Sequence, residues 1–165
     1  MTEADSVGPN KNDFEPNIIA FCCNWCGYRA ADSAGIQKIE YSPGLRIIHV
    51  MCSGMVHLNF IINALNKGAD GVLIFGCYRK EDLKNLGSTK YKACHYIDSN
   101  KTAESRAEAV QLLLEDFGLE PERFRLEWIS ASEGDKFAQI VKEMTETLRA
   151  LGPNTNIQTL PLIKE

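Results

Sequence analysis

Short apolar runs alternate along this chain with longer amphipathic segments. Runs of this length are typical of buried strands, whereas apolar positions spaced three and four residues apart predict helices. The runs predict four strands, at residues 17–23, 45–51, 71–75 and 124–129. The amphipathic segments predict helices at residues 28–38, 58–65, 99–117 and 137–151, with Ser53 and Ser132 as N-caps of the second and the last.

Strands that alternate with helices of roughly ten or more residues indicate βαβ units, whose right-handed crossovers place helices on both faces of a parallel sheet. We therefore predict an α/β fold, a small three-layer doubly wound (Rossmann- or flavodoxin-like) arrangement with about four parallel strands. Residues 1–13 are expected to form a flexible N-terminal segment and residues 14–152 a single α/β domain. Residues 153–165 are expected to form a C-terminal tail, whose apolar residues pack on a partner subunit or are loosely held.

Five of the six cysteines lie at or just beyond the carboxyl end of a predicted strand. Because the carboxyl ends of parallel strands meet at one edge of a sheet, thiols far apart in the chain are brought together there. That edge is also where doubly wound folds bind ligands. The sequence therefore predicts a thiolate-bound metal centre, built from Cys22, Cys23, Cys26, Cys52 and Cys77.

The spacing of the cysteines favours metal ligation. Cys23 and Cys26 form a C-x-x-C motif, which lets both sulfurs face one metal. With the remaining cysteines, including Cys94, the count exceeds the four thiolates of a zinc site or a [2Fe–2S] cluster. One or two thiols are then spare, outside the ligand set or redox-active. A buried cysteine can also simply pack as a small apolar side chain, an interpretation that suits Cys22 best.

Composition narrows the function further. The formal net charge of −4 and pI near 5.5 argue against a nucleic-acid-binding protein. The polar N-terminus has no signal-peptide core, and no stretch approaches the roughly 18 apolar residues of a membrane span. We expect a soluble, cytoplasmic protein, whose thiols stay reduced rather than forming disulfides. The chain has neither a GxGxxG nor a GxxxxGK[ST] motif, so a bound nucleotide is poorly supported.

The histidines and the basic segment between Cys77 and Cys94 are less informative. His95 adjoins Cys94 and could serve as a ligand or hydrogen-bond partner, although a surface histidine is the simpler interpretation. His49 and His57 are interpreted as packed or solvated side chains. Residues 78–93 carry five basic and two acidic side chains, which suits a docking site for an acidic partner or, more simply, a solvated loop.

Several motifs occur in a fixed order along the chain. They are FCCNWC at residues 21–26, RIIHVMCSG at 46–54, GADGV at 68–72, GC at 76–77, CHY at 94–96 and RLEWISASEG at 125–134. Together they resemble the delta subunit of methyl-viologen-reducing hydrogenase across residues 14–153.

This resemblance implies a cytoplasmic subunit with one [2Fe–2S] cluster. Such a subunit passes electrons from a hydrogenase or formate dehydrogenase to the flavin-bearing subunit of heterodisulfide reductase, in flavin-based electron bifurcation in methanogenic and related anaerobes. It would belong to an oxidoreductase complex and have no catalytic pocket of its own. The implied cluster ligands are Cys23, Cys26, Cys52 and Cys77, with Cys94 a close candidate and Cys22 a possible substitute.

One departure from the family pattern concerns Cys94. Family members usually have the Gly-Cys and Cys-His-Tyr elements a few residues apart, but sixteen residues separate Cys77 from Cys94 here. Cys94 is therefore the least secure ligand. Three other functions remain open from the residues alone: a C-x-x-C dithiol oxidoreductase, a structural zinc module and an interaction subunit with packed cysteines.

Overall fold

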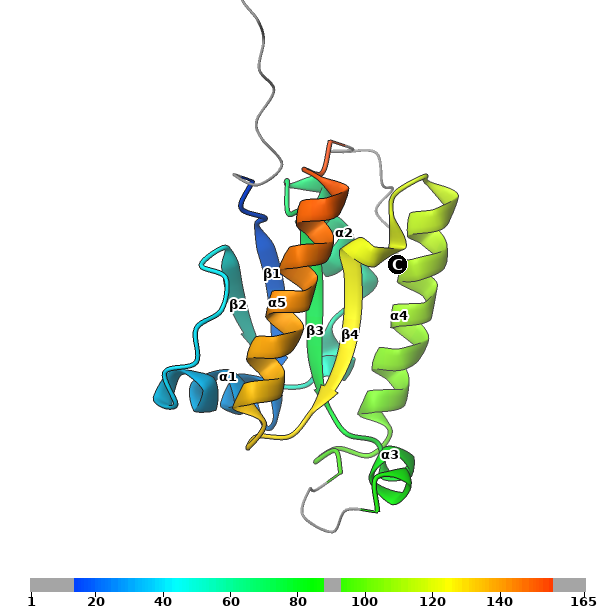
Figure 1. The fold of residues 1–165 in the computed structure, drawn as a ribbon. Helices are drawn as coiled ribbons and strands as arrows, with labels where there is room; N and C mark the ends of the chain where they lie inside the picture. Colours follow the sequence, from blue (N-terminus) through cyan, green and yellow to red (C-terminus); the bar gives the residue numbers. More distant parts are fainter. Residues whose placement is uncertain (1–13, 88–92, 156–165) are drawn as a thin grey trace, which may run out of the picture.

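A four-stranded, all-parallel sheet in the order β2-β1-β3-β4 forms the middle layer of the computed structural model (Figure 1). Its strands are β1 (Ile18–Cys23), β2 (Leu45–Val50), β3 (Gly71–Cys77) and β4 (Phe124–Ile129). This arrangement confirms the predicted α/β, doubly wound class. The structure describes residues 14–87 and 93–155. The predicted N-terminal segment, residues 88–92 of the basic segment and residues 156–165 of the tail lie outside the described residues.

Helices cover both faces of the sheet. On one face lie α1 (Gly27–Ile36) and α5 (Gly134–Leu151), and on the other lie α2 (Leu58–Asn66) and α4 (Ser99–Asp116). Three short helices complete the described chain: η1 (Ser53–Met55), α3 (Lys80–Asn85) and η2 (Pro121–Arg123). Among the helices described, none combines the length and the apolar character needed to cross a membrane.

Burial follows the position of each strand in the sheet. Every residue of β3 is buried, as expected for a central parallel strand whose apolar run is covered on both faces. On one side, Leu73 and Phe75 pack against Phe137 of α5, while on the other Ile74 packs among side chains of α2 and α4. The edge strand β2 is partly exposed along its length.

Both predicted N-caps were wrong. Ser53 begins the short helix η1, and α2 is capped instead by His57, whose Nδ1 accepts the Asn59 N–H at 3.2 Å. Ser132 precedes the N-cap of α5, Glu133, whose carboxylate accepts the Ser130 N–H at 2.7 Å. In both cases the chain turns once more before the helix begins, so the N-cap lies later in the sequence than predicted.

A buried polar lock holds the amino-terminal edge of the sheet. The Asp70 carboxylate accepts the backbone N–H groups of Asn17 and Asn154, each at 2.8 Å. The Arg123 guanidinium is almost fully buried and donates to the carbonyl oxygens of Asp70 (3.0 Å) and Gly152 (3.1 Å). The lock therefore ties the starts of β1 and β3 to the chain that leaves α5.

The contact between α1 and α5 gives a paired stability prediction. A Cβ at Gly134 would lie 2.5 Å from the backbone nitrogen of Ala34, whereas a Cβ at Gly35 would meet nothing within 4 Å. Gly134→Ala should lower the free energy of unfolding by ~1–3 kcal/mol, because the backbones must separate. Gly35→Ala should raise it by about 0.5 to 1 kcal/mol, because alanine favours an exposed helical position. Urea unfolding measures both, and equal effects of the two substitutions would contradict this packing.

Candidate metal centre

Five thiols are positioned at the carboxyl edge of the sheet. The central strands β1 and β3 end in cysteines, β2 is followed by one within two residues, one is the N-cap of α1, and one lies in the loop before α4. In that order they are Cys23, Cys77, Cys52, Cys26 and Cys94.

The thiols of Cys23 and Cys77 form the closest pair, with their Sγ atoms 3.4 Å apart. Both side chains are nearly inaccessible, at 1% and 2% exposure. Two thiolates on one tetrahedral metal with ~2.3 Å bonds stand roughly 3.8 Å apart. The two ends of β1 and β3 thus already hold their sulfurs near the spacing of neighbouring ligands.

Cys77 also lies near enough to Cys26 and Cys94 to influence the pKa of both thiols. Cys52 is buried and lies near enough to Cys94 to affect its titration electrostatically. Within residues 14–87 and 93–155, no three His, Cys, Asp or Glu side chains are arranged to enclose a single metal ion. The thiol contact that the described residues show is the pair formed by Cys23 and Cys77.

The long segment between Cys77 and Cys94 returns to the sheet. The Cys94 N–H donates to the Tyr78 carbonyl at 3.0 Å, and Asn100 Nδ2 donates to the same oxygen at 3.3 Å. Cys94 is therefore held directly beside the residue that follows Cys77. The sixteen-residue separation does not move Cys94 away from the other thiols.

Part of this segment folds as α3, which the sequence pattern did not predict. Arg79 is fixed at the start of α3 by Asp82 (2.7 Å) and by Glu104 of α4, with its guanidinium over the Trp128 ring. The arginine of the predicted basic loop is therefore occupied by internal ion pairs. Two of its lysines, Lys90 and Lys92, lie outside the described residues.

Cys22 is placed differently from the other five cysteines. Successive side chains of a strand point to opposite faces, so Cys22 and Cys23 diverge. Cys22 is fully buried in the core beneath α1 and α5, beside Ala30 and Phe137. This burial raises the pKa of the Cys22 thiol to about 12. Its surroundings are those of a small apolar packing residue.

Donors around Cys23 and Cys26 favour their thiolate forms. A hydrogen bond from Cys77 and backbone N–H groups of the turn that starts α1 lower the pKa of Cys23 to about 6. The same Cys77 thiol, helped by the Ala131 N–H, lowers the pKa of Cys26. The contacts of Cys77 with Cys23 and Cys26, together with its burial, raise the pKa of Cys77. The site is thus organised around negative charge on sulfur, as a thiolate-bound metal requires.

Trp25 supplies an independent test of what the site can hold. Its indole nitrogen is buried and, among the residues that the structure describes, has no hydrogen-bond acceptor. The ring stacks on His95, with centroids 4.1 Å apart. A buried N–H without an acceptor is costly, and most such groups in proteins are paired. Thiolate or sulfide sulfur accepts such a bond, so the residues present fit a sulfur-rich anionic group.

Hydrogen bonds behind the thiols connect β3 to the loop before α5. The Tyr78 hydroxyl donates to Glu133 (3.2 Å) and accepts from Lys136 (2.9 Å), which also donates to the Trp128 carbonyl (2.7 Å). These bonds position the loop whose Ala131 N–H reaches Cys26. Spacing along the chain could not reveal this contact, because it joins segments about a hundred residues apart.

The three histidines have local structural contacts. His49 is exposed, with its Nε2 2.8 Å from Asn24 Oδ1 and its ring against Tyr28. His57 caps α2, and His95 stacks on Trp25. Sequence reasoning did not predict a role for Trp25 or for the Ala131 N–H. Trp25 could have been noticed from the sequence, since it lies between the two cysteines of the C-x-x-C motif.

Comparison with known proteins agrees with the earlier resemblance. The family model described as methyl-viologen-reducing hydrogenase, delta subunit, matches residues 18–152. The F420-non-reducing hydrogenase iron-sulfur subunit of Archaeoglobus profundus is 46% identical over 141 residues, which are 86% of this chain and 94% of that protein. The F420-non-reducing hydrogenase vhc iron-sulfur subunit of Methanococcus voltae is 41% identical over 143 residues, 87% of this chain and 91% of that protein.

A further relative carries the matching region inside a larger protein. It is one of the subunits of ferredoxin/F420H2-dependent CoB-CoM heterodisulfide reductase from Methanosarcina acetivorans, 40% identical over 138 residues. The match covers 84% of this chain but 16% of that protein. The chain belongs to the methyl-viologen-reducing hydrogenase delta subunit family.

Proposed function

We propose that this protein is an electron-transfer subunit that holds a [2Fe–2S] cluster at the carboxyl edge of its sheet. The observation that carries the proposal is the gathering of five thiols there, with Cys23 and Cys77 buried and 3.4 Å apart. When bound, such a cluster accepts and releases one electron at a time. In this proposal the chain is the relay subunit of a cytoplasmic oxidoreductase complex.

Four of the five gathered thiols hold the cluster. Cys23 and Cys77 are favoured by their spacing, and Cys26, Cys52 and Cys94 compete for the other two positions. Cys22 is left out of this set because it packs in the core. The remaining residues exclude water and present N–H groups to sulfur, which stabilises the negative charge of the site.

The names of the relatives support the partners in this proposal. Two are hydrogenase iron-sulfur subunits, and another includes the matching region within a larger polypeptide of heterodisulfide reductase. A region that is fused to a reductase in one protein can act in contact with that reductase as a separate chain. We infer that electrons pass from a hydrogenase or formate dehydrogenase to the flavin-bearing subunit of heterodisulfide reductase, in flavin-based bifurcation.

The number of gathered thiols distinguishes this function from dithiol exchange. A redox-active C-x-x-C must present a thiolate to the disulfide of its substrate. Cys23 has the lowered pKa of such a group but is 1% exposed, and its hydrogen-bond partner Cys77 is 2% exposed. Cys26, the other cysteine of the motif, is only partly buried. Exchange through Cys23 and Cys26 would leave the gathered thiols of Cys52, Cys77 and Cys94 without a role, so the arrangement favours a metal centre.

Iron and acid-labile sulfide analysis of the anaerobically purified full chain tests the proposal. We expect about two irons and two sulfides per chain. Cys23→Ala and Cys77→Ala should each lose most of both, because each removes a thiolate of the closest pair. Cys22→Ala is the matched control and should keep the full content. A colourless protein with one zinc per chain would support the structural zinc module instead.

Trp25→Phe tests the fit of the site through the reduction potential. The substitution keeps a ring against His95 but removes the buried indole donor. Hydrogen bonds to sulfur stabilise the more negative, reduced state, so the midpoint potential should become more negative. An exchangeable proton coupled to the reduced centre should also disappear from the ENDOR spectrum.

Trp128→Phe is the control for this experiment, since the Trp128 ring lies over Arg79 and the same chemical change is made there. It should leave the proton coupling intact. If Trp25→Phe altered neither the potential nor the coupling, the indole would have no bond to the centre.

A further inference from the structure

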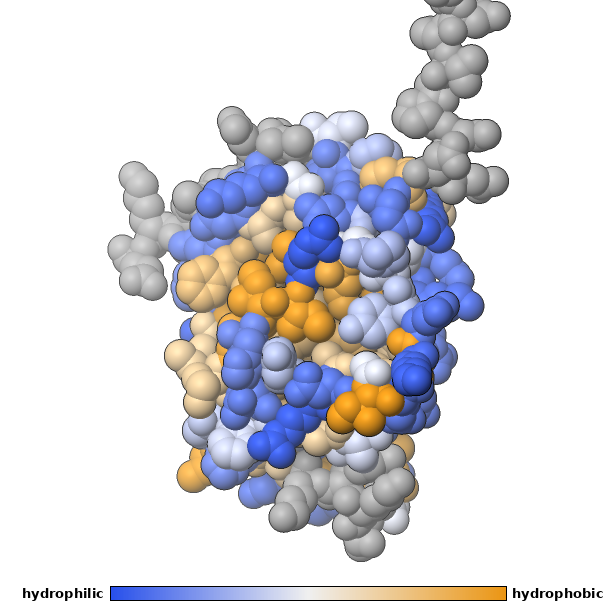
Figure 2. All heavy atoms as spheres, turned by 90° about the vertical axis from the view of Figure 1, so that its left-hand side faces the viewer, coloured by the Kyte–Doolittle hydropathy of each residue, from blue (hydrophilic) through white to orange (hydrophobic). Residues whose placement is uncertain are grey.

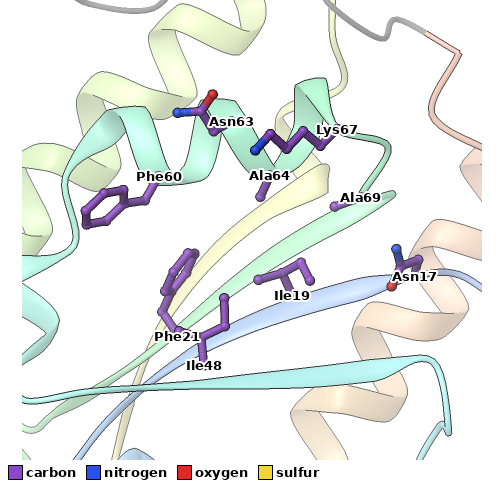
Figure 3. A pocket seen from close by; sticks show the side chains of 9 residues that line it. All are labelled: Asn17, Ile19, Phe21, Ile48, Phe60, Asn63, Ala64, Lys67 and Ala69. Carbon is purple, nitrogen blue, oxygen red and sulfur yellow. The ribbon is translucent and has the colours of Figure 1, made fainter.

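An apolar groove lies between α2 and the β1–β2 side of the sheet. It has a volume of about 450 Å³ and is lined mainly by apolar side chains of both strands and the helix, with Asn17, Asn63 and Lys67 also in its lining (Figure 3). Phe60 of α2 is 52% exposed and Ile48 of β2 is 42% exposed. Figure 2 shows hydrophobic residues gathered on this side of the molecule, with hydrophilic residues around them.

The groove results from the way helices cover this face. Ile48 pairs in register with Phe21 of β1, so both side chains project from the same face of the sheet. Helices α2 and α4 pack over β1, β3 and β4 there, whereas β2 lies at the open edge. The side chains of α2 and β2 therefore face each other across an unfilled space.

The described chain ends at the rim of this groove. Asn154 Nδ2 donates to the carbonyl oxygens of Leu65 (3.0 Å) and Ala69 (2.9 Å), at the end of α2. Its N–H donates to Asp70, the same carboxylate that holds Asn17. Ala69 and Asn17 both line the groove. The chain is thus anchored at the rim one residue before Thr155, where the described part stops.

The segment that follows has the composition and the length to fill the groove. Residues 156–165 read NIQTLPLIKE, with four aliphatic side chains and no charge before Lys164. Ten extended residues reach ~33 Å, whereas a nine-residue helix such as α2 is only about 13 Å long. Residues 1–13 are a poor alternative, because their apolar residues are only Met1, Ala4 and Val7 among four charged ones.

We propose that residues 156–165 of this chain occupy the groove, with their aliphatic side chains covering Ile48 and Phe60. Burying these two exposed side chains stabilises the fold through the hydrophobic effect. The proposal concerns the side of the sheet away from α1 and α5 and does not depend on which metal the thiols hold.

Unfolding of the full chain and of a chain ending at Thr155, prepared identically, tests the proposal. Removing the segment should raise the unfolding equilibrium constant at least tenfold, which is ~1.4 kcal/mol. Leu160→Ser with Leu162→Ser in the full chain should act in the same direction without shortening it. A synthetic peptide of residues 156–165, added to the shortened chain, should restore the lost stability.

A double-mutant cycle locates the contact. Phe60→Ser should destabilise the full chain clearly and the shortened chain much less, because its partner is then absent. Phe117→Ser, at a side chain 46% exposed beyond the end of α4, is the matched control and should cost the same in both chains.

Two outcomes would overturn the proposal. Equal stability of the two chains, with additive effects of Phe60→Ser, would mean that the segment lies elsewhere and leaves the groove to a partner. Light scattering that shows a dimeric full chain and a monomeric shortened chain would mean that the segment covers a second copy.

Discussion

The parallel pairing of β1 with β3 is the constraint on which the candidate centre depends. Ladder hydrogen bonds from Ile18–Gly71 to Cys22–Phe75 hold these strands in register, and their buried side chains leave no room for a shift. The sulfurs of Cys23 and Cys77 therefore meet where the strands end. Every other thiol is positioned relative to this pair.

The loops next to Cys23 and Cys77 bring N–H donors and the other thiols to this pair. The turn after Cys23 brings three N–H groups to its sulfur and starts α1 at Gly27. In the loop before α4, the Cys94 N–H donates to the carbonyl oxygen of Tyr78, the residue after Cys77. At the opposite edge, Asp70 and Arg123 join the strand starts to the end of α5. The thiols thus lie at one edge of the sheet, and the buried hydrogen bonds of Asp70 and Arg123 hold the opposite edge.

Much of this arrangement could be predicted from sequence because parallel strands share an edge. Alternating strands and helices predicted the fold class, and cysteines at strand ends predicted their convergence. The position of Cys94 could not be predicted, because it depends on α3 and on a bond to Tyr78. The packing of Cys22 in the core was expected from sequence, but the Ala131 donor could not be predicted, because it comes from a distant loop. The positions of Cys94 and of the Ala131 N–H depend on contacts between distant parts of the chain, which a local sequence pattern does not reveal.

In the proposed subunit, sulfurs from distant parts of the chain hold one centre of bridged irons. Iron K-edge X-ray absorption on the anaerobically purified full chain tests it most directly. A bridged cluster should give a first shell of sulfur alone, with one iron neighbour for each iron. A shell containing nitrogen or oxygen, or iron without an iron neighbour, would contradict it.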